Sequence, residues 1–148
     1  MSFKNKLELS GVIKKLEEKK STLPHQLANI AQSAFLNNFR TSSFFGKKWK
    51  EVQRRIPGTN AYKYPKKDTS KNKRGILLGQ TRHLFHSVAH SIRQADWHEI
   101  RLGTDIPYAE YHNEGTDKIP QRRFMGDHPN LRAKLRQRIN SEINSIFP

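Results

Sequence analysis

Residues 101–126 read RLGTDIPYAEYHNEGTDKIPQRRFMG, and their turn and helix signals set the expected fold. Pro107 suits the first turn of a short helix, where its missing amide costs little. Asp105 can accept hydrogen bonds from the first free amides of that helix. Gly115 suits a left-handed residue that ends it. The stretch therefore predicts a helix over about 107–114 inside a rigid corner that presents a surface.

One side of this short helix is expected to be aromatic. Tyr108 and Tyr111 are three residues apart and share a face with His112. The connector that follows contains Pro120 and Phe124. No active-site arrangement is recognisable among these residues, so the corner favours a role in packing against other proteins.

The same stretch resembles the virion morphogenesis or tail completion family of tailed bacteriophages, including Mu-like phages. That family reads V-G-T, a few residues, Y-A, two residues, H-N, one residue and G, followed by a segment like I-P-A-R-P-F-L-G. The matching residues are Leu102-Gly103-Thr104, Tyr108-Ala109, His112-Asn113, Gly115 and the run from Ile119 to Gly126. Gln121 and Arg123 depart from the pattern, because the family has a small residue and a proline there.

A second, upstream segment extends the resemblance. Residues 79–84 (GQTRHL) followed by Ser87-Val88 are similar to the family's T-G, one residue, L, two residues, S-I, although the Thr-Gly pair is not kept. The similarity covers about residues 24–147. No part is diagnostic alone, and the order of the parts carries the resemblance.

The resemblance implies a structural, non-enzymatic protein that completes the tail or joins it to the head. It would need no cofactor, and its partners would be copies of itself in a ring and neighbouring tail and connector proteins. It would be made in the host bacterial cytoplasm and then reside in the virion. The expected assembly-surface or motif residues are Gly103, Tyr108, Ala109, Tyr111, His112, Gly115, Pro120, Arg123 and Phe124.

Composition limits the alternatives. A length of 148 residues predicts a single domain over 1–148, and an apolar content of 34% predicts a small core. The absence of cysteine excludes disulfides and thiolate zinc sites. No apolar run resembles a signal peptide or a membrane span, so we expect a soluble protein without a membrane partner.

The chain is strongly basic, with a net charge of +15. Residues 54–74 hold eight Lys or Arg and one Asp, with little apolar content, so they predict a long, flexible, basic loop. This loop could contact DNA that passes through the lumen of a ring, and a sequence-independent nucleic-acid-binding module is the alternative function. The candidate contacts are Lys63, Lys66, Lys67, Lys71, Lys73 and Arg74.

Helical signals dominate the first forty residues. Residues 3–9 alternate weakly and predict an edge strand or a frayed end. Ser10 suits the N-cap of a first helix that ends near Lys20, and Thr22 and Pro24 mark the start of a second. The apolar stripe of the second helix consists of Leu27, Ile30, Ala31, Ala34, Phe35 and Phe39.

The period of residues 76–92 allows one helix, or a helical turn followed by a strand. The resemblance favours the second, in which 87–93 pair with 97–102 across a loop at 94–96. A final amphipathic helix opens near Asp127 and Pro129, with an apolar stripe of Leu131, Leu135, Ile139, Ile143 and Ile146. The expected fold is α+β: N-terminal helices packed on a small antiparallel sheet, a long basic loop and a C-terminal amphipathic helix.

Histidines are the remaining chemical candidates. His83, His86 and His90 have helical spacing, but no nearby carboxylate completes a metal-binding motif, so no metal site is expected. His98 and His112 could serve as acid–base groups of a small nuclease, which is a weaker alternative. No catalytic residue is assigned.

Overall fold

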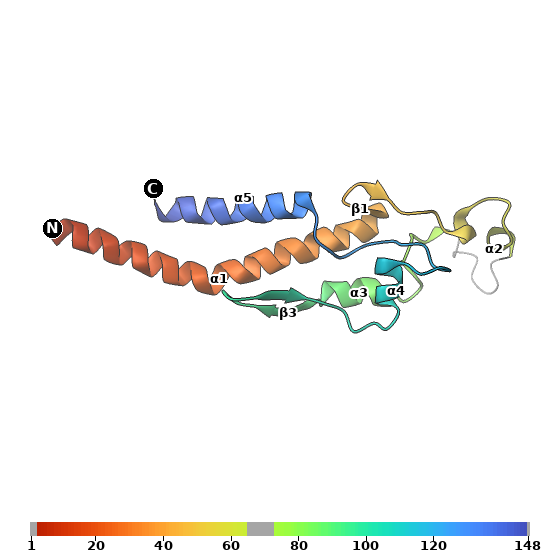
Figure 1. Cartoon of the computed structure of the whole chain (residues 1–148), viewed down its shortest axis with the longest axis horizontal. Coiled ribbons are helices and arrows are strands. Elements are labelled where there is room, and N and C mark those ends of the chain that lie inside the picture. The colour runs from red at the N-terminus through yellow and green to blue at the C-terminus, as the bar shows by residue number, and fades with distance from the viewer. Residues whose placement is uncertain (1–2, 65–72, 148) are drawn as a thin grey trace. The chain divides into compact units, whose positions relative to one another are not determined.

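The computed structural model describes residues 3–64 and 73–147, with side chains from residue 10 onward (Figure 1). Helices and short antiparallel strand pairs make up these residues, so the predicted α+β class is confirmed. The chain forms two compact units. The helix unit comprises Met1–Gln32, Ile92–Leu102 and Asp127–Pro148; the corner unit comprises Ser33–Ser91 and Gly103–Gly126. A single domain over the whole chain stays a prediction.

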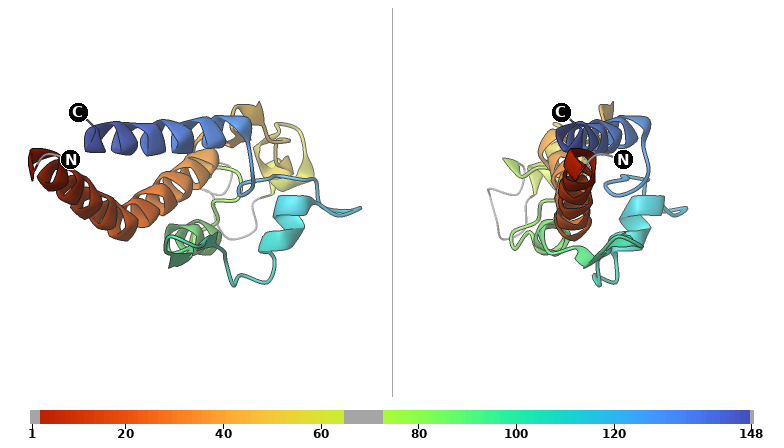
Figure 2. Two further views of the ribbon diagram at one scale, coloured as in Figure 1. Left: turned by 60° about the vertical axis from the view of Figure 1, so that its left-hand side comes forward. Right: turned by 90° about the vertical axis from the view of Figure 1, so that its left-hand side faces the viewer.

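One long helix replaces the expected N-terminal strand and pair of helices. Helix α1 spans Phe3–Thr41, so the strand or frayed end at 3–9 and the helix boundary near Pro24 are both wrong. Pro24 lies inside α1, where proline costs about 3 kcal/mol. Leu23 and Ala28 are buried on either side of it, and their burial offsets that cost. Figure 2 shows a bend near the middle of α1, as an internal proline produces.

Helix α5 (Pro129–Ile146) lies antiparallel to the first part of α1 within the helix unit (Figure 1). Arg138 donates to the Gln26 side chain at 3.0 Å, and Lys19 forms an ion pair with Glu142. His128 caps α5 by accepting the Asn130 amide, which agrees with the predicted start of this helix.

The apolar stripe predicted for α5 is only partly buried. Leu131 and Ile146 are buried, Leu135 and Ile139 are partly exposed, and Ile143 is 45% exposed. Within this unit α5 lies beside α1, so only the part of its apolar circumference that faces α1 is buried there.

The β3–β4 hairpin completes the helix unit. Strand β3 (Ile92–Ala95) pairs with β4 (Ile100–Leu102), so an antiparallel hairpin forms as predicted, but β3 begins later than residue 87 and the loop follows residue 95. Asp96 sets this loop, because its Oδ1 accepts the amides of His98 and Glu99 at 2.8 and 2.9 Å. A carboxylate in this position closes a turn by itself.

The core of the corner unit is aromatic. Phe39 is fully buried and its ring contacts Trp49, Phe85 and Phe124, with centroids 5.9, 5.8 and 5.0 Å apart. The predicted helical stripe contributes Ala34, Phe35 and Phe39 to this core, while its member Ala31 is buried in the helix unit and Leu27 and Ile30 are only partly buried. Rings in these geometries stabilise a core beyond the area that they bury.

Short elements lead from α1 to the basic stretch. Strands β1 (Ser43–Phe44) and β2 (Lys47–Lys48) form a small hairpin, and a 3-10 turn η1 covers Gln53–Arg55. Helix α2 (Asn60–Lys63) follows, capped by the Thr59 hydroxyl, which accepts the Tyr62 amide at 3.3 Å. The stretch predicted as one structureless loop therefore contains helical turns up to residue 64. Residues 65–72 lie outside the described part.

Two short helices frame the predicted corner. Helix α3 (His83–Ala89) precedes β3, so the helical turn followed by a strand is confirmed. Helix α4 (Ala109–Glu114) lies within the range predicted for it. Its N-cap is Tyr108, without a side-chain bond, so Asp105 is not the cap. Thr104 stabilises the preceding turn instead, since its hydroxyl accepts the Ile106 amide at 3.2 Å.

Candidate functional site

The candidate site is the corner formed by α4 and the connector after it, and Asn113 holds these two parts together. Its Oδ1 accepts the amides of Phe124 and Met125, each at 3.0 Å. Its main-chain oxygen accepts the Gln121 side chain at 3.2 Å. Two amides on one acceptor fix the direction in which the connector leaves the corner.

Gly115 allows the connector to return closely along α4. Its φ is 79°, and a Cβ atom there would lie 2.9 Å from the Gln121 amide nitrogen. Such a separation is shorter than real Cβ contacts, so only glycine fits without a shift of the backbone. The Arg122 amide then donates to the His112 carbonyl at 2.8 Å, which ties the returning chain to the helix.

The connector is anchored in the core of the corner unit because buried side chains donate hydrogen bonds to its main-chain oxygens. Asn38, which is 2% exposed, donates to the Phe124 carbonyl at 3.0 Å and accepts the Phe45 amide at 3.1 Å. The Trp49 indole donates to the Arg123 carbonyl at 2.8 Å. Buried polar groups that are satisfied in this way specify one arrangement of the chain.

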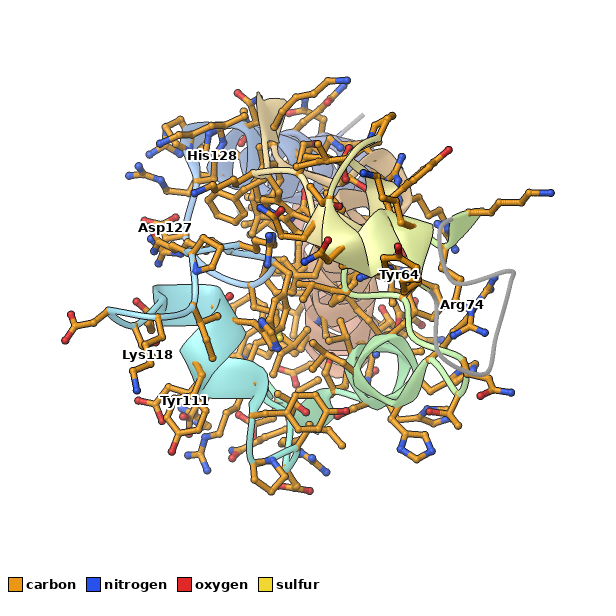
Figure 3. The ribbon with its side chains drawn as sticks, turned by 90° about the vertical axis from the view of Figure 1, so that its right-hand side faces the viewer. Tyr64, Arg74, Tyr111, Lys118, Asp127 and His128 are labelled. Atoms are coloured by element: carbon orange, nitrogen blue, oxygen red, sulfur yellow. The ribbon has the colours of Figure 1, made fainter. Side chains whose placement is uncertain are left out.

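The outer side of α4 carries exposed aromatic rings. Tyr108 and Tyr111 are 43% and 53% exposed, whereas Ala109 between them is buried. Figure 3 shows Tyr111 directed outward from α4, with Tyr64 and Arg74 at the other side of the view. The predicted aromatic side is therefore present, and the arrangement suits contact with another protein.

A basic pocket of about 340 Å³ lies beside α4, and we call it the arginine pocket. Its charged lining consists of Arg54, Arg74, Arg82 and Arg122, with His83 and His112 beside them. Among the described residues, no Asp or Glu lines this pocket. Glu51 lies outside the lining, and its charge favours the protonated forms of Arg54 and Arg122. The fold thus brings four guanidinium groups from separate positions in the sequence around one small volume.

Burial lowers the pKa of two of these arginines, and for one of them the charges of neighbouring arginines lower it further. Burial lowers the pKa of Arg54, and the charges of Arg55, Arg74 and Arg122 lower it further. Burial also lowers the pKa of Arg122, which is only 8% exposed. The Arg122 guanidinium donates to the main-chain oxygens of Lys50 at 3.0 Å and Glu51 at 3.4 Å. These contacts fix the guanidinium at the wall of the pocket.

His112 belongs to both the corner and the pocket. Burial lowers its pKa, and the charge of Arg122 lowers it further, so the neutral imidazole is favoured. Its Nδ1 is buried without a hydrogen-bond partner among the described residues. An unsatisfied buried polar atom of this kind costs about 1–3 kcal/mol.

An acidic pocket of about 440 Å³ lies at another side of α4. Its lining includes Asp105, Glu110 and Glu114, together with the motif residues Gly103, Ala109 and Phe124. The corner therefore separates a positive surface from a negative one.

The structure brings together most of the predicted motif residues. In the corner unit, Ala109 and Phe124 are buried, Gly103 lines the acidic pocket, and Pro120 is half-buried in the connector. The Arg123 guanidinium lies over the Phe44 ring at 5.4 Å, although its position departs from the family pattern. Gly115 and His112 have the roles described above.

The predicted nucleic-acid contacts are only partly placed. Lys63 and Lys73 are exposed, and Arg74 lines the arginine pocket. Lys66, Lys67 and Lys71 lie outside the described residues.

Five residues of the site were not among the predicted site residues, although Asn113 and Arg122 stand in the motif that carries the resemblance. Asn38 and Asn113 organise the corner, and Arg54, Arg82 and Arg122 form the pocket with Arg74. Asn38 carries a signal that could have found it, since it follows Phe35 by three positions on the buried face of α1. Arg122 and Arg82 lie in the two motif segments and Arg54 in the basic stretch at 54–74, but nothing in the sequence showed that they would lie around one pocket.

Metal and membrane features are absent from the described part of the chain. No group of three His, Asp or Glu side chains there could hold a metal ion, and His90 Nδ1 lies 2.9 Å from the His86 carbonyl oxygen. None of the helices in that part has an apolar run sufficient to cross a bilayer.

Comparison with protein-family models, curated proteins and solved structures gave no match.

Proposed function

We infer that this chain is a structural protein of a tailed bacteriophage, acting in tail completion or in joining the tail to the head. The supporting observation is the interlocked corner. Asn113, Gly115 and Phe124, which carry the family resemblance, contact one another or the same connector. Their spacing in the sequence matches the contacts that join α4 to the connector. The corner that they build presents Tyr108 and Tyr111 to the outside.

The corner also offers the two unlike surfaces that a ring requires. In a closed ring of identical subunits, one surface of each subunit meets a different surface of the next. The acidic pocket with Asp105, Glu110 and Glu114 differs in charge from the remainder of this basic unit. The exposed Tyr111 lies on the same short helix as Glu110 and Glu114, and the exposed Tyr108 is the N-cap of that helix. We assign this face to contact with a second copy or with a neighbouring tail or connector protein.

The role is non-enzymatic and needs no cofactor. The protein is made in the bacterial cytoplasm and becomes part of the virion at the head–tail junction or tail end. Purified particles of the encoding phage should contain the chain, and antibody labelling should mark the neck or tail end. A chain absent from particles, with free heads and tails also unlabelled, would contradict this placement.

A basic nucleic-acid-binding module is the second candidate. Exposed Lys63 and Lys73 and the pocket residue Arg74 favour it, because they place positive charge on both sides of residues 65–72. Binding to DNA should then be independent of sequence and should weaken steeply with salt. If replacing Lys63, Lys73 and Arg74 by glutamine leaves the salt dependence unchanged, these residues do not contact DNA.

A further inference from the structure

We propose that the acidic pocket of one copy of this chain receives the β1–β2 hairpin of a second copy. Lys47 and Lys48 at the surface of the hairpin then pair with carboxylates that line the pocket, such as Glu110. This inference rests on the proposed function, which requires copies to meet through unlike surfaces, and it names those two surfaces.

The acidic pocket combines an apolar wall with a negatively charged rim. Its apolar lining consists of Ile106, Pro107, Ala109, Phe124 and Met125. Glu110 and Glu114 are exposed, lie one turn apart on α4 and line the same volume of about 440 Å³. No Lys or Arg among the described residues belongs to this lining. Such a pocket suits a side chain with an apolar stem and a cationic end.

The β1–β2 hairpin offers the complementary chemistry. Lys47 and Lys48 make up the whole of β2, and both are exposed. Phe44 pairs with Lys47 across the hairpin and is half-buried. The stem of a lysine can cover apolar surface while its ammonium group reaches a carboxylate. The hairpin therefore carries positive charge beside aromatic surface, as the pocket carries negative charge beside apolar surface.

The hairpin is held in place before any partner arrives. The Phe45 amide donates to the buried Asn38 side chain at 3.1 Å. The Arg123 guanidinium lies over the Phe44 ring, 5.4 Å from its centroid. A segment that is already ordered loses little conformational freedom on binding, and this strengthens binding.

The two surfaces of one copy do not meet each other. Arg123 lines a small pocket of about 190 Å³ together with Lys47 and Lys48, whereas the next residue, Phe124, lines the acidic pocket. No hairpin residue is among the described lining of the acidic pocket. Each copy thus offers a pocket and a hairpin to different neighbours, which is a head-to-tail contact.

Charge favours a second copy as the occupant. Each copy has a net charge of +15, so copies repel one another over most of their surface. The acidic pocket is a local exception within the corner unit. Attraction confined to one place sets the orientation of a contact. Because every copy supplies one pocket and one hairpin, the contact can repeat around a ring without another protein.

Cross-linking tests the contact, because the chain contains no cysteine. Glu110→Cys and Lys48→Cys each place one thiol at one of the two surfaces, and both positions are exposed. A concentrated, low-salt mixture of the two full-length variants, treated with a short bis-maleimide reagent, should give a covalent dimer of unlike copies. Neither variant alone should give it. Added salt should lower its yield severalfold, because exposed charges are screened.

Lys118→Cys is the matched control for Lys48→Cys. Lys118 is exposed, carries the same charge and lies in the same unit outside the linings of both pockets. Its mixture with Glu110→Cys should give several-fold less dimer. Equal yields from the two mixtures would reduce the contact to random collision and overturn the proposal. Dimers of like copies as abundant as those of unlike copies would also overturn it.

Charge reversal provides a second measurement. A pocket variant with Glu110→Lys and Glu114→Lys, or a hairpin variant with Lys47→Glu and Lys48→Glu, should lose self-association in sedimentation velocity, because like charges then meet. Mixing the two variants should restore association, since each pocket then finds a hairpin of opposite charge. Restoration also shows that both variants fold. Variants with unchanged thermal midpoints that do not associate when mixed would contradict the contact.

The failure of this contact can be told apart from the failure of the proposed function, because cross-linking needs no phage. If the unlike dimer is absent but phage lacking the chain make heads and tails that do not join, the virion role stands and the pocket has another occupant. If the thiol of Glu110→Cys in particles links to a different protein, that protein is the occupant and the proposal falls. If the unlike dimer forms but the mutant phage is normal, the contact stands without the virion role.

Discussion

The side-chain oxygen of Asn113 accepts the amide of Phe124 at 3.0 Å and thereby joins a short helix to a connector eleven residues further along. The same oxygen accepts the Met125 amide, also at 3.0 Å. Phe124 is 1% exposed and contacts Phe39 in the aromatic core. One asparagine therefore couples the exposed corner to the core of its unit.

Replacing Asn113 by alanine should destabilise the corner unit. Two partly buried amides would lose their acceptor, at about 1–3 kcal/mol each, so we expect a loss of roughly 2–6 kcal/mol. Urea unfolding followed by Trp49 fluorescence measures it, since Trp49 donates to the neighbouring connector residue. The control is Asn37→Ala on the exposed side of α1, with an expected change below about 0.5 kcal/mol. Equal effects of the two changes would exclude Asn113 as the organising residue.

Gly115→Ala should destabilise the fold by at least about 1 kcal/mol. The added Cβ would meet the Gln121 nitrogen at 2.9 Å, and the φ of 79° is itself unfavourable for alanine. Gly103→Ala is the matched control, because a Cβ there meets nothing within 4 Å. Thermal unfolding of both variants should show a lower midpoint for Gly115→Ala alone. If Gly115→Ala is as stable as the original chain, the connector does not approach Gly115 as closely as the structure shows.

These positions show how far the sequence could predict the fold. The three- and four-residue spacing around Phe35 and Phe39 predicted a buried helix face, because that period comes from local geometry alone. Pro24 led to a wrong prediction of two helices instead of one. The free-energy cost of a proline inside a helix is outweighed here by the burial of neighbouring residues, and the sequence alone does not show which residues are buried. The observed strands of the hairpin differ from the predicted ones because the side chain of Asp96 fixes the position of the turn. The periodicity of apolar residues in the strands does not show this position.

The site was less predictable than the fold. The residues of the corner could be found because they are close in sequence and follow an ordered pattern. Their partners could not, since Asn38 is 86 residues away from Phe124 and the pocket arginines meet only after folding. In a chain with so many basic residues, the sequence did not indicate which arginines would lie around one pocket.

Stability should depend on the protonation of His112. Its pKa is lowered from 6.5 by burial and by Arg122, so the unfolded chain binds this proton more readily. The contribution of the neutral imidazole is present above pH 6.5 and is lost as pH falls through the folded pKa. Relative to His112→Gln, the original chain should therefore lose stability between about pH 7 and pH 5. Urea titrations at several pH values measure this difference, and a constant or rising difference would contradict the lowered pKa.

Tyr111→Ala should impair assembly without unfolding the protein. The ring is 53% exposed, so the thermal midpoint should change little, whereas a central aromatic contact is worth 2 kcal/mol or more. Complementation of a phage lacking the gene should yield at least about tenfold fewer infectious particles with this variant. Tyr64→Ala is the control, since Tyr64 is 72% exposed and lies outside α4. If both variants restore full titre, the aromatic side of α4 is not the assembly surface.

The central claim is that the chain completes the tail or joins it to the head, and electron microscopy of particles made without it tests this most directly. A deletion in the encoding phage should give filled heads beside separate tails, or tails of abnormal length that do not join. A plasmid copy of the gene should restore joined, infectious particles. Normal infectious particles from the deletion would contradict the assignment, whatever the purified protein binds.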